Sequence, residues 1–176
     1  MLTVNASSNV DLLPGVRNAD ANATVNDLSI LLSSFGIDLT ANTIQSTASV
    51  TGDFGNFNAI GTTTFEGLML NGVASLFIAP APNTVLLSLP GLTITLNEQF
   101  TSTDGLGSSG MEVNAIHVDF DNYLSLGYGV VNGDIIVAHS EAFISAVPEP
   151  ETYSMILAGL ALMGAIVRRS KINGCA

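Results

Sequence analysis

The chain is poor in positive charge. Its 176 residues include only 4 Lys and Arg against 15 Asp and Glu, so the formal net charge is −11. Three of the four bases lie close to the C-terminus, and residues 1–147 hold 13 acids and one base, Arg17, for a net charge of −12. Such a surface repels nucleic-acid phosphates and anionic lipid headgroups, so we expect no nucleic-acid partner.

Cysteine and tryptophan are nearly or wholly missing. The single cysteine, Cys175, excludes an internal disulfide and a cysteine-based metal site. No Trp is present and aromatic residues make up 6% of the chain, so stacking surfaces for bases or sugar rings are scarce. The first residues contain neither a basic nor an apolar targeting segment, which leaves two interpretations. Either the protein is cytoplasmic, or its signal peptide precedes the given start.

The C-terminal tail consists of three consecutive segments of different character. Pro148-Glu149-Pro150 is stiff and extended, Thr152 to Val167 is an uncharged run of 16 residues, and Arg168, Arg169 and Lys171 close it. As a helix the run is about 24 Å long, shorter than the roughly 30 Å hydrocarbon core, a shortfall that snorkelling arginines and local thinning can cover. Its large side chains, which we expect in the membrane, are Tyr153, Met155, Ile156, Leu157, Leu160, Leu162, Met163, Ile166 and Val167.

The basic cluster sets the expected orientation of this tail. Basic residues after an apolar run predict a cytoplasmic C-terminus, which places the acidic body outside that membrane and favours a missing signal peptide. The alternative is a helix buried in the domain. Apolar residues all round the run and its abrupt basic end disfavour that alternative.

The order of these segments resembles the PEP-CTERM sorting signal of Gram-negative bacteria. The resemblance covers 147–171, with 172–176 as a short extension. It implies processing by exosortase, in which cleavage near Pro148-Glu149-Pro150 releases the body from an inner-membrane intermediate in the periplasm to the cell surface. It also implies a biofilm context with exopolysaccharide as a partner.

The body shows alternating runs in place of helical periodicity. Ile44–Thr51 and Leu92–Leu96 alternate, and Asn71-Gly72, Pro90-Gly91 and Asn132-Gly133 predict turns between strands. The expected strands near the C-terminal side are 111–120, 123–130 and 134–144. We therefore expect an all-β fold over 24–146, an antiparallel β-sandwich or jelly roll, after a poorly ordered segment over 1–23 and before a single C-terminal hydrophobic helix.

The body also resembles the choice-of-anchor bacterial surface domains, in particular the group called choice-of-anchor P. The resemblance lies in Pro82-Asn83-Thr84, in 96–99, in 113–118 and in 133–138, and covers about residues 24–146. These domains share a body and differ in their C-terminal anchor. The resemblance implies a location at the surface and supplies no activity.

Candidate site residues in the body are few. His117 and His139 each have a carboxylate two residues later, Asp119 and Glu141, and could bind a metal if their strands pair suitably. We expect ordinary sheet residues there, and no metal. Asp119 and Asp121 could bind Ca²⁺, although a solvated acidic turn is the favoured interpretation.

Catalysis has no motif behind it. Ser140 beside His139 is not a nucleophile elbow, and no motif pairs two glutamates across a cleft. The sequence predicts a non-enzymatic exported surface or matrix protein without a cofactor. A Ca²⁺- or glycan-binding module is the alternative, and an unrecognised hydrolase is a weaker one.

Overall fold

The computed structural model describes residues 1–9, 15–53, 56–104, 107–125, 129–145 and 154–163. The chain divides into two compact units, Met1–Ser145 and Ala146–Ala176, which we call the body and the tail. In the tail, residues 154–163 form a helix.

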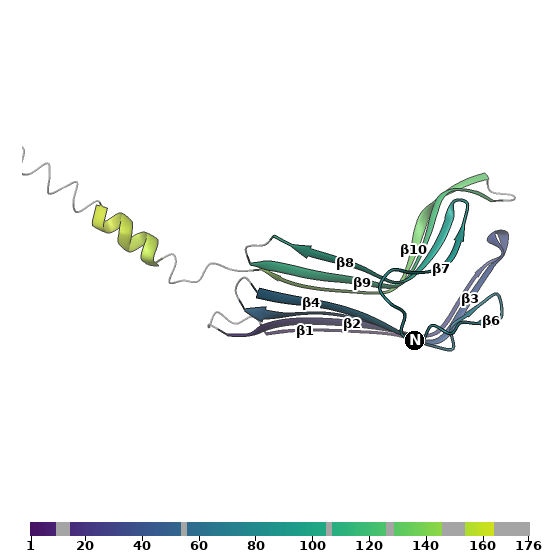
Figure 1. Ribbon diagram of the computed structural model, residues 1–176, viewed down its shortest axis with the longest axis horizontal. Coiled ribbons are helices and arrows are strands. Elements are labelled where there is room, and N and C mark those ends of the chain that lie inside the picture. Colours follow the sequence, from purple (N-terminus) through teal and green to yellow (C-terminus); the bar gives the residue numbers. More distant parts are fainter. Residues whose placement is uncertain (10–14, 54–55, 105–106, 126–128, 146–153, 164–176) are drawn as a thin grey trace, which may run out of the picture. The chain divides into compact units, whose positions relative to one another are not determined.

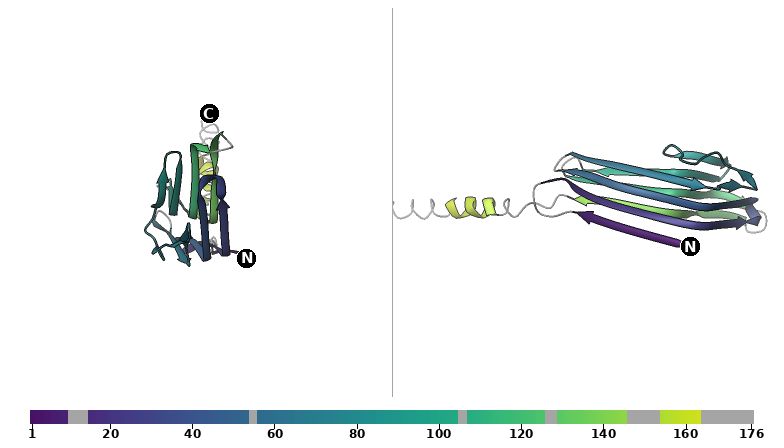
Figure 2. Two further views of the ribbon diagram at one scale, coloured as in Figure 1. Left: turned by 90° about the vertical axis from the view of Figure 1, so that its right-hand side faces the viewer. Right: turned by 90° about the horizontal axis from the view of Figure 1, so that it is seen from below.

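The body consists of two antiparallel sheets (Figures 1 and 2). The first sheet, sheet A, contains β1 (Leu2–Asn9), β2 (Arg17–Leu32), β3 (Ile37–Asp53), β4 (Asn56–Glu66), β5 (Met69–Leu70) and β6 (Val73–Ala74). The second, sheet B, contains β7 (Thr84–Leu89), β8 (Leu92–Thr103), β9 (Ser108–Ser125) and β10 (Gly129–Ser145). A single 3-10 turn, η1 (Ser33–Phe35), joins β2 to β3.

Strand order within each sheet follows the sequence. Sheet B runs β10-β9-β8-β7, and sheet A runs β1-β2-β3 with both β4 and β5 paired to β3. The all-β, two-sheet prediction is confirmed. The jelly-roll alternative is wrong, because a jelly roll has long crossovers between non-consecutive strands. Sheet B is a meander, and the single non-consecutive pair among the described strands of sheet A joins β3 to the two-residue β5, beside β4 on the same edge of β3.

The N-terminal segment is a correction to the sequence analysis. Residues 1–23 were expected to be poorly ordered, but β1 pairs along its whole length with β2, from Leu2 opposite Val25 to Asn9 opposite Asn18. Every residue of β1 is exposed. Backbone hydrogen bonds to a neighbouring strand can hold a strand that buries no side chains. The side chains of such a strand can be polar, so its sequence lacks the apolar alternation by which strands are predicted.

The Asn132-Gly133 turn is a second correction. β9 continues to Ser125 and β10 begins at Gly129, so three expected strands are two. Residues 132 and 133 lie inside β10, where the register shifts between Val131 and Gly133. Asn132 uses its side chain there: its Oδ1 accepts a hydrogen bond from the Asn122 backbone N–H at 2.7 Å. The Asn-Gly pair therefore forms a bulge instead of a turn. The Asn71-Gly72 and Pro90-Gly91 turns are confirmed.

Two buried clusters hold the sheets together. In the larger cluster, Leu39 and Ile44 of sheet A pack with residues of sheet B that include Ile94 and Leu96. The smaller includes Val50 of β3 and, from sheet B, the fully buried Val113 of β9. Side chains from both sheets interdigitate in each cluster, as sheet-on-sheet packing requires.

Buried polar side chains lie among the residues between these clusters. Ser46 and Thr63, which pair directly across β3 and β4, and Ser140 of β10 are at most 3% exposed. Gln99 links the sheets, since its Nε2 donates to the Gly61 carbonyl of β4 at 2.8 Å.

The long strands bend where single residues leave the extended conformation. Asp27 in β2, Asn97 in β8 and Ala138 in β10 have φ of 56°, 52° and 52°. Each lies at a gap in the pairing, and the two sheets bend along their length (Figure 1). We call the bend at Asn97 in β8 the kink. Leu96 and Gln99 both point inward although they are three residues apart, so the alternation of inward and outward side chains changes phase at the kink.

Candidate functional site

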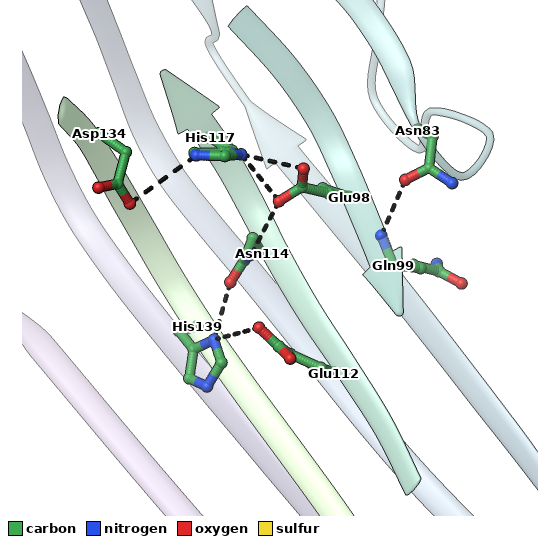
Figure 3. A network of polar contacts seen from close by, with 8 residues as sticks. All are labelled: Asn83, Glu98, Gln99, Glu112, Asn114, His117, Asp134 and His139. Atoms are coloured by element: carbon green, nitrogen blue, oxygen red, sulfur yellow. Dashed lines mark hydrogen bonds and ion pairs between the residues drawn. The ribbon is translucent and has the colours of Figure 1, made fainter. Parts of the chain in front are cut away.

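A network of polar side chains lies on the outer face of sheet B, beside the kink (Figure 3). Glu98, Asn114 and His139 stand in one row across β8, β9 and β10. Their neighbours Val113 and Ser140 are buried. Because successive side chains in a strand point to opposite faces, Asn114 and His139 point outward.

Asn114 connects the two histidines of the chain. Its Nδ2 donates to Glu98 Oε2 at 2.9 Å, so its Oδ1 must accept the bond that joins it to His139 Nδ1 at 2.7 Å. His139 therefore carries a proton on Nδ1. His117 Nδ1 lies 2.9 Å from Glu98, and the carboxylate can only accept, so His117 also donates from Nδ1 when Glu98 is ionised.

Two more carboxylates complete the network. Asp134 Oδ2 is 3.8 Å from His117 Nε2, and Glu112 Oε1 is 3.9 Å from His139 Nδ1. Burial falls from the centre outward. Asn114 is 2% exposed, the side chains of Glu98 and His117 are 16% and 21% exposed, and those of Glu112 and His139 are 40% and 44% exposed. Each central group has a polar partner within the network, which orients the imidazoles on the sheet surface.

The predicted partners of the histidines differ from the observed ones. The sequence placed Asp119 with His117 and Glu141 with His139. Neither pair forms a contact that the structure records, and among the described residues no group of three or more His, Cys, Asp or Glu could hold a metal ion. Carboxylates at i+2 share a strand face but lie along the strand, whereas partners across strands come closer.

The two Ca²⁺ candidates, Asp119 and Asp121, do not form a cation site with other described residues. Asp119 lies opposite Asp134 across β9 and β10, and Asp121 Oδ1 accepts a hydrogen bond from Asn122 Nδ2 at 2.8 Å. Two like charges directly opposite each other destabilise a strand pair. The described residues bring no third metal ligand to them.

Four members of the network were missed as histidine partners: Glu98, Glu112, Asn114 and Asp134. Their positions follow from the β8–β9 and β9–β10 registers. The turn at Pro90-Gly91 fixes only the β7–β8 register, so the sequence carried no signal for the other two.

Ser140 faces away from His139. Its hydroxyl is buried between the sheets and has no hydrogen-bond partner among the described residues. A serine that is activated by an adjacent histidine must share its face. These two residues are consecutive in a strand and point to opposite sides.

One shallow hollow brings two acidic residues together. A space of about 280 Å³ lies between β1, β2 and β10, and Asp20 and Glu141 are among its lining residues. Asp20 is already held, since Asn18 Nδ2 donates to it at 2.7 Å and Ser49 Oγ at 2.6 Å. The carboxylate of Asp20 is therefore occupied by two neighbouring donors from the same sheet.

The tail helix has an entirely exposed surface. Its large apolar residues Met155, Ile156, Leu157, Leu160, Leu162 and Met163 are 55–74% exposed. Ten helical residues are about 15 Å long. Within the described ranges, no helix combines the length and the apolar character needed to cross a membrane.

The other expected tail residues lie outside the described part of the chain. These are Pro148, Glu149, Pro150, Tyr153, Ile166, Val167, Arg168, Arg169 and Lys171.

Comparison with known proteins identifies the tail. Residues 146–171 match the family described as the PEP-CTERM protein-sorting motif. The tail carries a sorting motif. The PEP-CTERM motif implies an exported protein that exosortase processes. The match excludes the body, so the resemblance of the body to choice-of-anchor domains has no support from it. No curated protein and no solved structure matches the chain.

Proposed function

We propose that this protein is a non-enzymatic component of the cell surface or extracellular matrix, held in the inner membrane by its tail until exosortase cleaves it. The observation that carries the proposal is the match of residues 146–171 to the PEP-CTERM sorting motif. Arg168, Arg169 and Lys171 then remain on the cytoplasmic side, and the acidic body lies on the other side.

The tail supplies two physical functions in this proposal. The uncharged run from Thr152 to Val167 retains the chain in the bilayer, where burial of each CH₂ contributes about 0.8 kcal/mol. Pro148-Glu149-Pro150 keeps the preceding chain extended, because proline fixes φ and biases its neighbour away from the helical region. An extended peptide is the form in which a processing enzyme can bind the backbone.

The body supports a binding or structural role more than a catalytic one. Its histidines are engaged by Glu98 and Asn114, and Ser140 lies on the opposite face from His139. We therefore propose no cofactor. We also propose that the body is a choice-of-anchor type domain, as its own resemblance implies. We further propose that its partners include exopolysaccharide in a biofilm, as the PEP-CTERM resemblance of the tail implies.

The first test measures the intact mass of the protein from membrane and surface fractions of its native host. The proposal predicts full-length protein in the membrane and, at the surface, a form lacking the residues that follow Pro148-Glu149-Pro150. Replacing Pro148-Glu149-Pro150 by three alanines should leave only the membrane form, whereas the control Glu151→Ala, which changes the acid next to Pro150, should be processed. Unchanged release of the triple variant, or full-length protein at the surface, would refute the proposal.

A further inference from the structure

The outer face of sheet A carries a regular array of polar side chains. The strand registers place one outward residue from each of β1, β2, β3 and β4 in four successive rows. The rows are Asn9-Asn18-Thr51-Asn58, Ser7-Asp20-Ser49-Ile60, Asn5-Asn22-Thr47-Thr62 and Thr3-Thr24-Gln45-Thr64. We call these sixteen residues the polar grid. All but Asp20 and Ile60 end in an amide or a hydroxyl group.

The grid residues of β2, β3 and β4 alternate with residues that face the core. Ala19 and Ala23 in β2, Ser46 and Ala48 in β3, and Thr63 in β4 are buried. The strand registers place the β1 members beside these outward residues, and every residue of β1 is exposed. The grid lies on the opposite face of sheet A from the buried clusters.

Neighbouring grid side chains hold one another in place. Thr47 Oγ1 and Thr62 Oγ1 are 2.6 Å apart, and Asn5 Nδ2 donates to Asn22 Oδ1 at 3.2 Å. A carboxamide offers two donor hydrogens and two acceptor lone pairs, and a hydroxyl offers one donor hydrogen and two acceptor lone pairs. Each of these two contacts uses one donor and one acceptor, so further groups are left for a ligand. Side chains that are already oriented lose less entropy when a ligand binds.

The composition of the grid departs from that of an ordinary solvated sheet face. Designed soluble surfaces are given about 25–35% charged residues, whereas Asp20 is the single charge among sixteen grid positions. Five positions are asparagine, a residue depleted in strands. Residues that oppose local propensity without a packing gain are expected at functional sites.

We infer that the polar grid binds a neutral polysaccharide lying flat across β1–β4. Amides and hydroxyls both donate and accept, as sugar hydroxyls do, and the grid repeats about every 6.6–6.8 Å along the strands and 4.7–4.9 Å across them. A repeating polyhydroxyl chain can satisfy many such groups at once. The net charge of −11 repels anionic polymers and leaves the neutral class. This inference deepens the proposed function by naming the face and the class of polymer, and it rests on export of the body to the surface.

The test uses the full-length chain in neutral detergent micelles. Retention is measured on beads of three neutral polysaccharides, dextran, a β-1,3-glucan and a galactomannan, and on carboxymethyl dextran. We expect retention on at least one neutral matrix and at least tenfold weaker retention on the carboxymethyl form. No retention on any neutral matrix, or equal retention on the charged one, overturns the inference.

Matched variants assign the binding to the grid. Thr47→Val with Thr62→Val removes two hydroxyls from one row while keeping side-chain shape and β-branching. Thr93→Val with Thr95→Val makes the same change on the outer face of β8. The grid variant should bind about tenfold more weakly, since each hydrogen bond contributes a several-fold factor, and the β8 variant should bind like the parent.

Folding and sorting are separated from binding in this design. Circular dichroism and thermal unfolding of both double variants establish that they fold. Equal weakening of the two variants, or unaltered binding by the grid variant, contradicts the assignment. The binding assay uses purified chain and does not depend on exosortase. Failed processing in the host together with intact binding in vitro refutes the proposed function alone. Normal processing together with absent binding refutes the grid inference alone.

Discussion

Gly61 of β4 packs directly against side chains of sheet B. A Cβ added there would lie 2.5 Å from Val113 Cγ2, 2.9 Å from Gln99 Cδ and 3.0 Å from Met111 Sδ. Val113 is fully buried and its χ1 is stiff, so it cannot turn away easily. We expect Gly61→Ala to destabilise the body by about 1–3 kcal/mol, the usual cost of overpacking.

A second substitution should recover much of that loss. Val113→Ala alone removes two buried methyl groups and should cost about 2 kcal/mol through lost burial and a residual cavity. In the Gly61→Ala, Val113→Ala double variant the added methyl occupies part of that cavity. We expect the double variant to lose about 2 kcal/mol in total, well short of the sum, which is a coupling of at least about 1 kcal/mol.

Urea unfolding followed by circular dichroism measures all four free energies of unfolding. Val118→Ala is the matched control, because Val118 is equally buried on β9 but is not among the atoms nearest to Gly61. Gly61→Ala should add to Val118→Ala without coupling. Additivity within about 0.5 kcal/mol for the Gly61–Val113 pair would refute the packing of β4 on β9 described above.

Three further perturbations test other parts of the chain. Ile94→Ala, in the larger cluster, should cost about 2–5 kcal/mol of unfolding free energy in urea titrations, whereas Ile60→Ala on the exposed face should cost under about 0.5. Asn114→Ala should cost about 1–3 kcal/mol by the same assay, because Glu98 and His139 lose their shared partner. Leu160→Arg in the tail should shift uncleaved protein from the membrane pellet towards the soluble fraction, and Ala161→Leu should not; equal fractionation of both would contradict retention by this helix.

Local chemistry sufficed to predict much of the fold. Leu92–Leu96 alternates in the sequence, and Leu92, Ile94 and Leu96 are at most 1% exposed. The Pro90-Gly91 turn was also found, since Gly91 has φ of 76° and a Cβ there would lie 2.7 Å from the Asp121 carbonyl oxygen. Such features depend on a few adjacent residues, and a sequence displays them directly.

Features that depend on pairing between distant strands were not predictable in the same way. β1 has the polar residues of a loop, and its order depends on β2. The Glu98–His117 contact depends on the register of β8 against β9, in which a shift of one residue would move every side chain to the other face. For the sorting tail the situation reverses, because its signal lies in the linear order of motif, apolar run and basic cluster.

Left-handed residues change which side chains face inward along the long strands. β9 and β10 have 18 and 17 residues, well above the usual five or six, and a twisted pair of that length diverges from a facing sheet. Asn97 and Ala138 lie opposite the same residue of β9, Ala115, so both neighbours of β9 interrupt their alternation at one level. Asparagine tolerates this conformation, and its buried Nδ2 donates to the Pro80 carbonyl at 2.8 Å. Ala138 has no side-chain hydrogen-bonding group and is held there by its neighbours, and the inward positions of β10 change phase across it, because Val137 and then Ser140 are buried.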